Sequence, residues 1–224
     1  MTQAGATAAR LASVRTRITR AAEAAGRDPR SVALVAVSKT QGTAEIEAAI
    51  HAGQRIFGEN RVQEARAKFP KLTARHAGLE LHLIGPLQTN KVKEAVALFD
   101  VIETVDRPKL ALMLAEEMRR VGKRVACYIQ VNIGAEPQKA GAAESDVGAL
   151  LALCRDDYRL PVVGLMCIPP AGVDPAPFFA RMAQLGRAHH LPILSMGMSG
   201  DFGAAIAAGA THVRVGTAIF GSRA

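Results

Sequence analysis

The sequence predicts a (β/α)8 barrel, and three observations favour this fold class. Eight short apolar segments with the composition of β-strands recur along the 224 residues. Segments rich in Ala, Leu and Glu separate them, and several of these end in glycine, which suits the end of a helix. Neither a linker nor a change in composition divides the chain, so we expect one barrel domain over residues 1–224. This alternation is typical of a closed parallel barrel, with a doubly wound sheet as the alternative.

The strands are predicted at residues 32–39, 55–59, 79–85, 101–105, 124–133, 162–168, 192–199 and 212–217. An extra helix is expected before the first strand, because apolar residues recur there at helical spacing. These residues are Leu11, Val14, Ile18, Ala21 and Ala25. No long helix follows the last strand, so we expect the N-terminal helix to fill that gap.

Composition and charge exclude several classes of function. The net charge is +8, and half of it lies in residues 1–30, where six arginines accompany two carboxylates. We interpret this as the solvated face of a helix, since no nucleic-acid-binding motif is present; a transit peptide is the alternative. No apolar run reaches the roughly 18 residues of a membrane span. Three cysteines without C-x-x-C spacing favour a cytoplasmic protein with neither disulfide nor metal.

A lysine at the end of the first strand is the first candidate functional residue. In "VALVAVSKTQ" (32–41), alternation places Val35, Val37 and Lys39 on one face. If that face points inward, the Lys39 amine lies at the carboxyl end of the strands, where barrels of this class hold their sites. Such an amine is a candidate for imine formation with a carbonyl compound. A lysine that simply points into water is the alternative.

The last two strands end in glycine-rich turns, "GMSGD" (197–201) and "VGTAIFG" (215–221). Each turn lets backbone N–H groups approach a phosphate and adds a hydroxyl, from Ser199 or Thr217. Loops after strands seven and eight often bind phosphate in this fold. An ordinary strand-to-helix turn is the alternative for each.

An arginine in the eighth strand completes the candidate site. Arg214 alternates with two valines, so we expect it to point into the barrel. A buried arginine needs a ligand or a carboxylate partner, for which Glu59 and Glu103 are candidates. A lysine, phosphate-binding turns and an inward arginine together favour an aldehyde that carries a phosphate. Pyridoxal 5′-phosphate (PLP) is the leading candidate, and a Schiff-base aldolase acting on sugar phosphates is an alternative function.

Several motifs resemble those of the pyridoxal phosphate homeostasis proteins, single-domain relatives of the alanine racemase N-terminal barrel. The matching stretches are "AVSKT" (36–40), "FGENRVQEA" (57–65), "HLIGPLQTNK" (82–91), "GLMCIPP" (164–170) and "SMGMSGDFGAAIAAGATHVRVGTAIFG" (195–221). The resemblance implies that Lys39 carries PLP as an internal aldimine. It places Arg214 at the pyridine nitrogen and Asn60 close to the ring. It implies three phosphate contacts, from Ser199, Gly216 and Thr217.

The resemblance predicts a PLP-binding protein of intracellular PLP homeostasis, which sequesters the cofactor or delivers it to PLP-dependent apoenzymes. Arg214 beside the pyridine nitrogen would disfavour its protonation and make the cofactor a poor electron sink. Alanine racemases take a second base, a tyrosine, from an additional domain, and we expect no such domain here. We therefore expect a monomer without catalytic turnover. A low-activity amino-acid racemase using His82 or a thiol is the alternative. We expect Lys139, in the polar loop 134–146, to be solvated.

Overall fold

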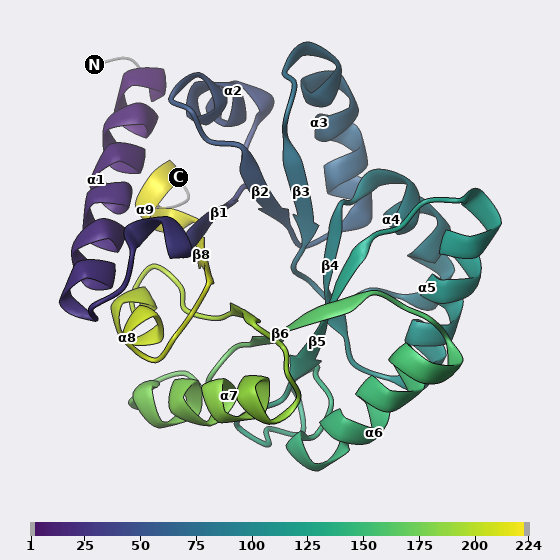
Figure 1. The fold of residues 1–224 in the computed structure, drawn as a ribbon. Coiled ribbons are helices and arrows are strands. Elements are labelled where there is room, and N and C mark those ends of the chain that lie inside the picture. The colour runs from purple at the N-terminus through teal and green to yellow at the C-terminus, as the bar shows by residue number, and fades with distance from the viewer. Residues whose placement is uncertain (1–2, 222–224) are drawn as a thin grey trace.

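The structure, a computed structural model, describes residues 3–221 and forms a closed eight-stranded parallel barrel (Figure 1). The strands are β1 (Ala33–Val37), β2 (Ile56–Glu59), β3 (Glu80–Leu83), β4 (Val101–Val105), β5 (Ala126–Val131), β6 (Val162–Cys167), β7 (Ile193–Ser195) and β8 (His212–Val215). Each strand pairs with the next, and β8 pairs with β1 to close the barrel. The eight predicted strands are confirmed, and the doubly wound alternative is wrong.

Helices surround the barrel in the order that the sequence predicts. They are α1 (Gln3–Ala24), α2 (Thr43–His51), α3 (Val62–Arg75), α4 (Val92–Leu98), α5 (Pro108–Val121), α6 (Val147–Ala152), α7 (Ala176–Ala188), α8 (Phe202–Ala207) and α9 (Thr217–Phe220). The ends of α5 follow its sequence. Pro108 occupies the first turn, where its missing N–H costs nothing, and Gly122 takes the left-handed conformation (φ 67°) just past the last turn.

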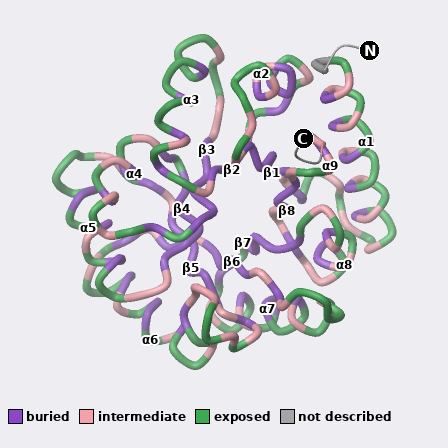
Figure 2. Tube along the Cα trace, turned by 180° about the vertical axis from the view of Figure 1, so that it is seen from behind, coloured by how far each residue is buried: buried purple, intermediate pink, exposed green. Residues whose placement is uncertain are grey.

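Each strand buries one face against the helices and the other inside the barrel. Phe57 of β2 points outward, since its ring lies 5.9 Å from that of Phe69 on α3. The inner face carries a small apolar cluster of Val101, Tyr128 and Met166. Figure 2 shows the strands as mostly buried tube and the helices as exposed on their outer sides. This two-sided burial explains why the strands read as nearly continuous apolar runs.

The N-terminal helix fills the gap beside β8, as predicted. Figure 1 shows α1 beside α2, α8 and the short α9, and these elements are in contact. Leu11, Val14 and Ile18 are buried as expected. Ala22 is fully buried, whereas Ala21 is only half-buried, so the apolar stripe shifts by one residue near the end of the helix.

The prediction of a solvated basic face is only partly right, because three of the six arginines in residues 1–30 bind backbone carbonyls. Arg10 Nε donates to the carbonyl of Ile219 at 3.0 Å. The other two are Arg15, which donates to Ala52, and Arg27, which donates to Ile206 and Ala210. These three arginine side chains therefore bond the N-terminal segment to the rest of the barrel domain. Within residues 3–221, no helix combines the length and apolar character needed to cross a membrane.

Candidate functional site

The first and last strands bring the predicted lysine next to the predicted phosphate-binding turn. In the β1–β8 pair, Val35 lies opposite Arg214. Lys39 follows the end of β1 by two residues, and Gly216 directly follows β8. A Cβ atom on Gly216 would lie only 3.2 Å from the carbonyl oxygen of Val37, so the two strand ends are in close contact. The barrel closure thus places Lys39 and the turn at residues 215–221 side by side.

The bonding of Ser38 shows which side of the chain faces the helices just before Lys39. Ser38 Oγ donates to Glu59 Oε1 at 2.6 Å, on the outer side of the barrel, where Lys68 of α3 binds the same carboxylate oxygen. Successive side chains of an extended strand alternate between its faces. Lys39 is half-buried in the turn that follows β1, and alternation continued from Ser38 predicts that its side chain points to the opposite side, toward the mouth of the barrel.

The two glycine-rich turns meet through their hydroxyl groups. Thr217 Oγ1 donates to Ser199 Oγ at 3.3 Å, although the residues are 18 positions apart. Ser199 is half-buried and Thr217 is exposed, so both hydroxyls are accessible at the mouth. Gly197 is required in its turn: its φ is +92°, and a Cβ atom there would lie 2.5 Å from the Ala205 Cβ. We call Ser199 and Thr217 the hydroxyl pair; it can donate hydrogen bonds to an anion.

Asn60 reaches the same rim from the neighbouring strand. Val37 lies opposite Gly58 in the β1–β2 pair. Lys39 lies two residues after Val37 and Asn60 two residues after Gly58, so both follow their strands at the same height of the barrel. Gly85, just after β3, permits this path, because a Cβ atom there would lie 2.3 Å from the Asn60 carbonyl oxygen. Asn60 is half-buried at this position.

Arg214 points into the barrel, as predicted, and is only 3% exposed. Its Nη1 donates to Ser195 Oγ at 2.7 Å, and its Nη2 donates to the Cys167 carbonyl at 2.8 Å. Its Nη1 also lies 3.8 Å from Glu103 Oε2. Of the two carboxylates considered from the sequence, Glu103 is the partner. Glu59 is not, because it faces α3.

Beyond Arg214 a line of polar side chains continues through the barrel, and sequence reasoning, which named Glu103 and His82 separately, did not predict that they form one network. Glu103 accepts hydrogen bonds from Ser195 Oγ and pairs with His82 Nδ1, each at 2.6 Å. His82 Nε2 in turn lies 2.7 Å from Glu80 Oε1. We call Glu80, His82, Glu103, Ser195 and Arg214 the interior polar column. The available signal was the alternation in "ELHL" (80–83) and "VIETV" (101–105), which puts polar residues at inward positions.

The charges of the interior polar column alternate in sign. Burial alone would lower the pKa of His82, but its hydrogen bonds to Glu103 and Glu80 raise that pKa to about 9. Burial opposes ionisation of Glu103, yet the hydrogen bond and charge of His82 hold its pKa below the usual range. At neutral pH the column therefore runs from negative Glu80 through positive His82 and negative Glu103 to positive Arg214.

Lys139 is not solvated as expected. Its Nζ donates to the Pro169 carbonyl at 3.0 Å and pairs with Glu136 Oε2 at 2.5 Å. The lysine therefore ties the loop 134–146 to the segment that follows β6.

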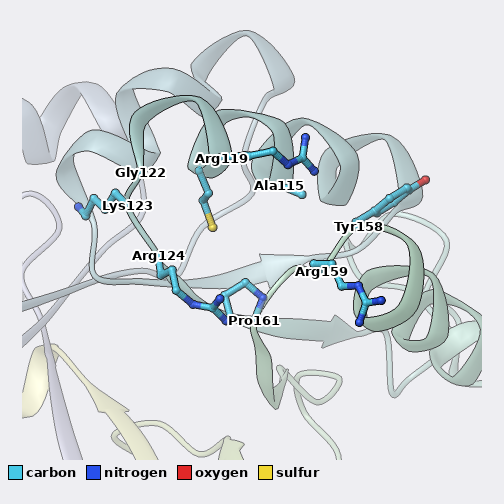
Figure 3. A pocket seen from close by; sticks show the side chains of 9 residues that line it. Ala115, Arg119, Gly122, Lys123, Arg124, Tyr158, Arg159 and Pro161 are labelled. Carbon is cyan, nitrogen blue, oxygen red and sulfur yellow. The ribbon is translucent and has the colours of Figure 1, made fainter.

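A separate hollow of about 290 Å³ lies at the opposite end of the barrel, where β5 and β6 begin (Figure 3). Tyr158 lines it, together with Arg119 and Arg159. None of the predicted site residues takes part in this hollow. In residues 3–221, no three or more His, Cys, Asp or Glu side chains are grouped to hold a metal ion.

Comparisons with known proteins agree with this arrangement. The family model described as alanine racemase, N-terminal domain, matches residues 9–224. A pyridoxal phosphate homeostasis protein of Pseudomonas aeruginosa is 42% identical over 218 residues, covering 95% of this chain and 94% of that protein. The protein of that name from Escherichia coli K12 is also 42% identical, over 224 residues, with 95% of each chain covered.

A solved structure shows the same likeness. The structure of PipY from Synechococcus elongatus with PLP bound superposes with a TM-score of 0.83 at 40% identity, covering 96% of this chain and 100% of PipY. The fold, the matched length and these identities agree. The chain therefore belongs to the pyridoxal phosphate homeostasis protein family.

Proposed function

We propose that this protein binds PLP at the barrel mouth and serves PLP homeostasis in the cytoplasm, sequestering the cofactor or delivering it to PLP-dependent apoenzymes. The observation that carries the proposal is the contact between the end of β1, two residues before Lys39, and Gly216, in the turn that holds Thr217 of the hydroxyl pair. PipY, solved with PLP bound, and the homeostasis proteins named above support it.

The residues at the mouth fit the chemical groups of PLP, which supplies an aldehyde, a phosphate and a pyridine nitrogen. Lys39 would attack the aldehyde carbon through Nζ, forming a C=N bond and releasing the aldehyde oxygen as water. Hydrolysis of that bond returns the free amine and the free aldehyde. The hydroxyl pair would donate to phosphate oxygens, and Arg214 would present its positive charge to the pyridine nitrogen.

The interior of the barrel favours a carrier over an amino-acid racemase. Both ring nitrogens of His82 are occupied by glutamates, and its pKa of about 9 keeps it protonated at neutral pH, so it cannot serve as a base. Burial raises the pKa of each cysteine thiol, which disfavours a thiolate base: Cys127, Cys154 and Cys167. Arg214 also disfavours a protonated pyridine nitrogen by repulsion between like charges. Among the described residues, neither His82 nor the three thiols is therefore suited to act as a second base, which favours the carrier.

The test of this function is an absorption spectrum of the purified protein together with a turnover assay. We expect a visible band that borohydride abolishes, with the reduced label on the peptide that contains Lys39. In heavy water, neither D-alanine nor L-alanine should exchange its α-proton at an enzymatic rate. Absence of the band after incubation with PLP would contradict the proposal. It is the result expected of a Schiff-base aldolase, which binds no chromophore. Rapid interconversion of the two alanines would favour the racemase.

The hydroxyl pair should determine affinity through the phosphate alone. Ser199→Ala and Thr217→Val each remove a hydrogen bond to a charged group, worth roughly 1.5–3 kcal/mol. Each change should weaken PLP binding about tenfold or more, whereas pyridoxal, which lacks the phosphate, should bind as it does to the unmodified protein. Titrations followed by absorbance or fluorescence measure both ligands. Ser13→Ala, on the exposed side of α1, is the matched control. Equal losses for both ligands would place the phosphate elsewhere.

A further inference from the structure

The backbone on both sides of Lys39 is held from the helix side of the barrel. Lys68 Nζ of α3 donates to the carbonyl oxygen of Ser38 at 2.9 Å. The backbone N–H of Thr40 donates to Glu64 Oε1, also on α3. The residue before Lys39 and the residue after it are therefore both bonded to one helix.

Lys68 links these contacts into one network. Besides the Ser38 carbonyl, its Nζ contacts Glu59 Oε1 at 2.9 Å and Glu64 Oε1 at 2.7 Å. The ammonium group thus uses all three of its donors. Lys68 is 8% exposed and lies among the apolar residues of α3, whereas an ordinary helical lysine is solvated. A lysine that is buried and uses all its donors indicates that its role is to hold the groups that it binds.

The segment that the network holds has an unusual conformation. Thr40 has a φ of 63°, in the left-handed region that a β-branched residue rarely adopts. Such a conformation persists only where surrounding contacts impose it. The hydrogen bond from the Thr40 N–H to Glu64 is one such contact, and the bond from the Gln41 N–H to the Ser38 carbonyl, at 3.1 Å, is another. The direction in which Lys39 leaves the backbone therefore depends on α3.

We propose that Lys68 and Glu64 are positioning residues, which fix the backbone around Lys39 so that its amine meets the PLP aldehyde while the hydroxyl pair holds the phosphate. This inference rests on the proposed function. Holding two reacting groups in the correct geometry accelerates and favours their condensation. Neither side chain touches the cofactor in this account. Loss of the network should impair formation of the C=N bond and leave phosphate recognition intact.

The experiment compares two ligands that differ at one group. PLP can condense with Lys39, whereas pyridoxine 5′-phosphate carries an alcohol in place of the aldehyde and can only occupy the phosphate contacts. We expect Lys68→Met and Glu64→Ala to weaken PLP binding and slow the appearance of the visible band, each by about tenfold or more. Pyridoxine 5′-phosphate should bind within twofold of its affinity for the unmodified protein. Glu64→Gln keeps the acceptor oxygen and should restore most of the capture rate.

Two controls separate positioning from folding. Lys71→Met changes an exposed lysine on the same helix and should leave both ligands unaffected. In the protein without PLP, hydrogen exchange at the Thr40 and Gln41 amides should accelerate in Lys68→Met and not in Lys71→Met. If Lys68→Met does not fold, Glu64→Ala carries the comparison, since the Glu64 side chain is already 24% exposed.

The outcomes distinguish the inference from the proposed function. No borohydride-fixed label on Lys39 of the unmodified protein would overturn both. A normal label there, with capture by Lys68→Met and Glu64→Ala at the unmodified rate, would overturn the positioning role alone. Equal weakening of PLP and pyridoxine 5′-phosphate would overturn it too, since the network would then support the whole site. Faster amide exchange without slower capture would leave Lys68 as a residue of fold stability only.

Discussion

Replacing Lys39 with alanine is expected to abolish the visible band and the borohydride-fixed label completely. An alanine has no amine with which to form the C=N bond, so only noncovalent contacts with the hydroxyl pair and Arg214 remain. The variant should retain some PLP at high concentration, and gel filtration should remove it. Absorbance spectra before and after borohydride, followed by peptide mass analysis, measure the effect.

Lys109→Ala is the matched control for this change. Lys109 is exposed in the first turn of α5, after β4, so it lies on the same rim of the barrel. This variant should keep the band and the label of the unmodified protein. A label that survives in Lys39→Ala, on Lys139 or on another lysine, would contradict the assignment of the amine.

We expect the free energy of unfolding to fall between pH 6.5 and pH 9 as His82 loses its proton. The folded-state pKa of His82 is about 9, above its ordinary value of 6.5. A raised pKa contributes stability that is fully present below pH 6.5 and is lost as the pH rises through about 9. A tenfold gain in proton affinity on folding corresponds to about 1.4 kcal/mol, so the loss should reach about 3 kcal/mol across this window. Urea unfolding at a series of pH values measures it.

His82→Gln should remove this slope. The variant should be less stable than the unmodified protein at pH 6, because Glu80 and Glu103 lose the cation between them. The two proteins should then approach each other as the pH rises to 9. His51→Gln, at the exposed end of α2, should keep the slope of the unmodified protein. Parallel curves for His82→Gln and the unmodified protein would show that His82 does not carry its charge in the folded state.

Strand alternation correctly predicted the direction of one candidate side chain, that of Arg214. The polar Arg214 alternates with Val213 and Val215, and the structure places the arginine inside the barrel as expected. For Lys39, which lies beyond the end of β1, the orientation of the side chain toward the mouth stays a prediction. The ends of strands were predicted less well. The seventh strand was expected at 192–199 but ends at Ser195, since the chain turns at Gly197 in a conformation that no strand adopts. Apolar composition alone does not reveal such a turn.

The partners of buried charges could not be predicted from the sequence. Glu59 and Glu103 both lie in apolar strands, yet Glu59 faces α3 and Glu103 faces the interior. An apolar strand does not show in its sequence which of its two faces points inward. Lys68 offered a weak signal. It lies three residues after Ala65 and four before Leu72, on the apolar stripe of its helix. The positive charge of residues 1–30 likewise did not predict which arginines are solvated and which bind backbone carbonyls.

The closure between β1 and β8 sets the order in which the site can be made during synthesis. Lys39 belongs to the first strand, whereas Thr217 follows the last, and Arg10 of α1 binds the carbonyl of Ile219 close to the C-terminus. A ribosome-bound chain therefore carries the lysine long before the groups that meet it. A long loop must close before such contacts can form, which makes their formation slow. The complete site therefore cannot assemble until the residues of β8 and of the turn after it have been synthesised.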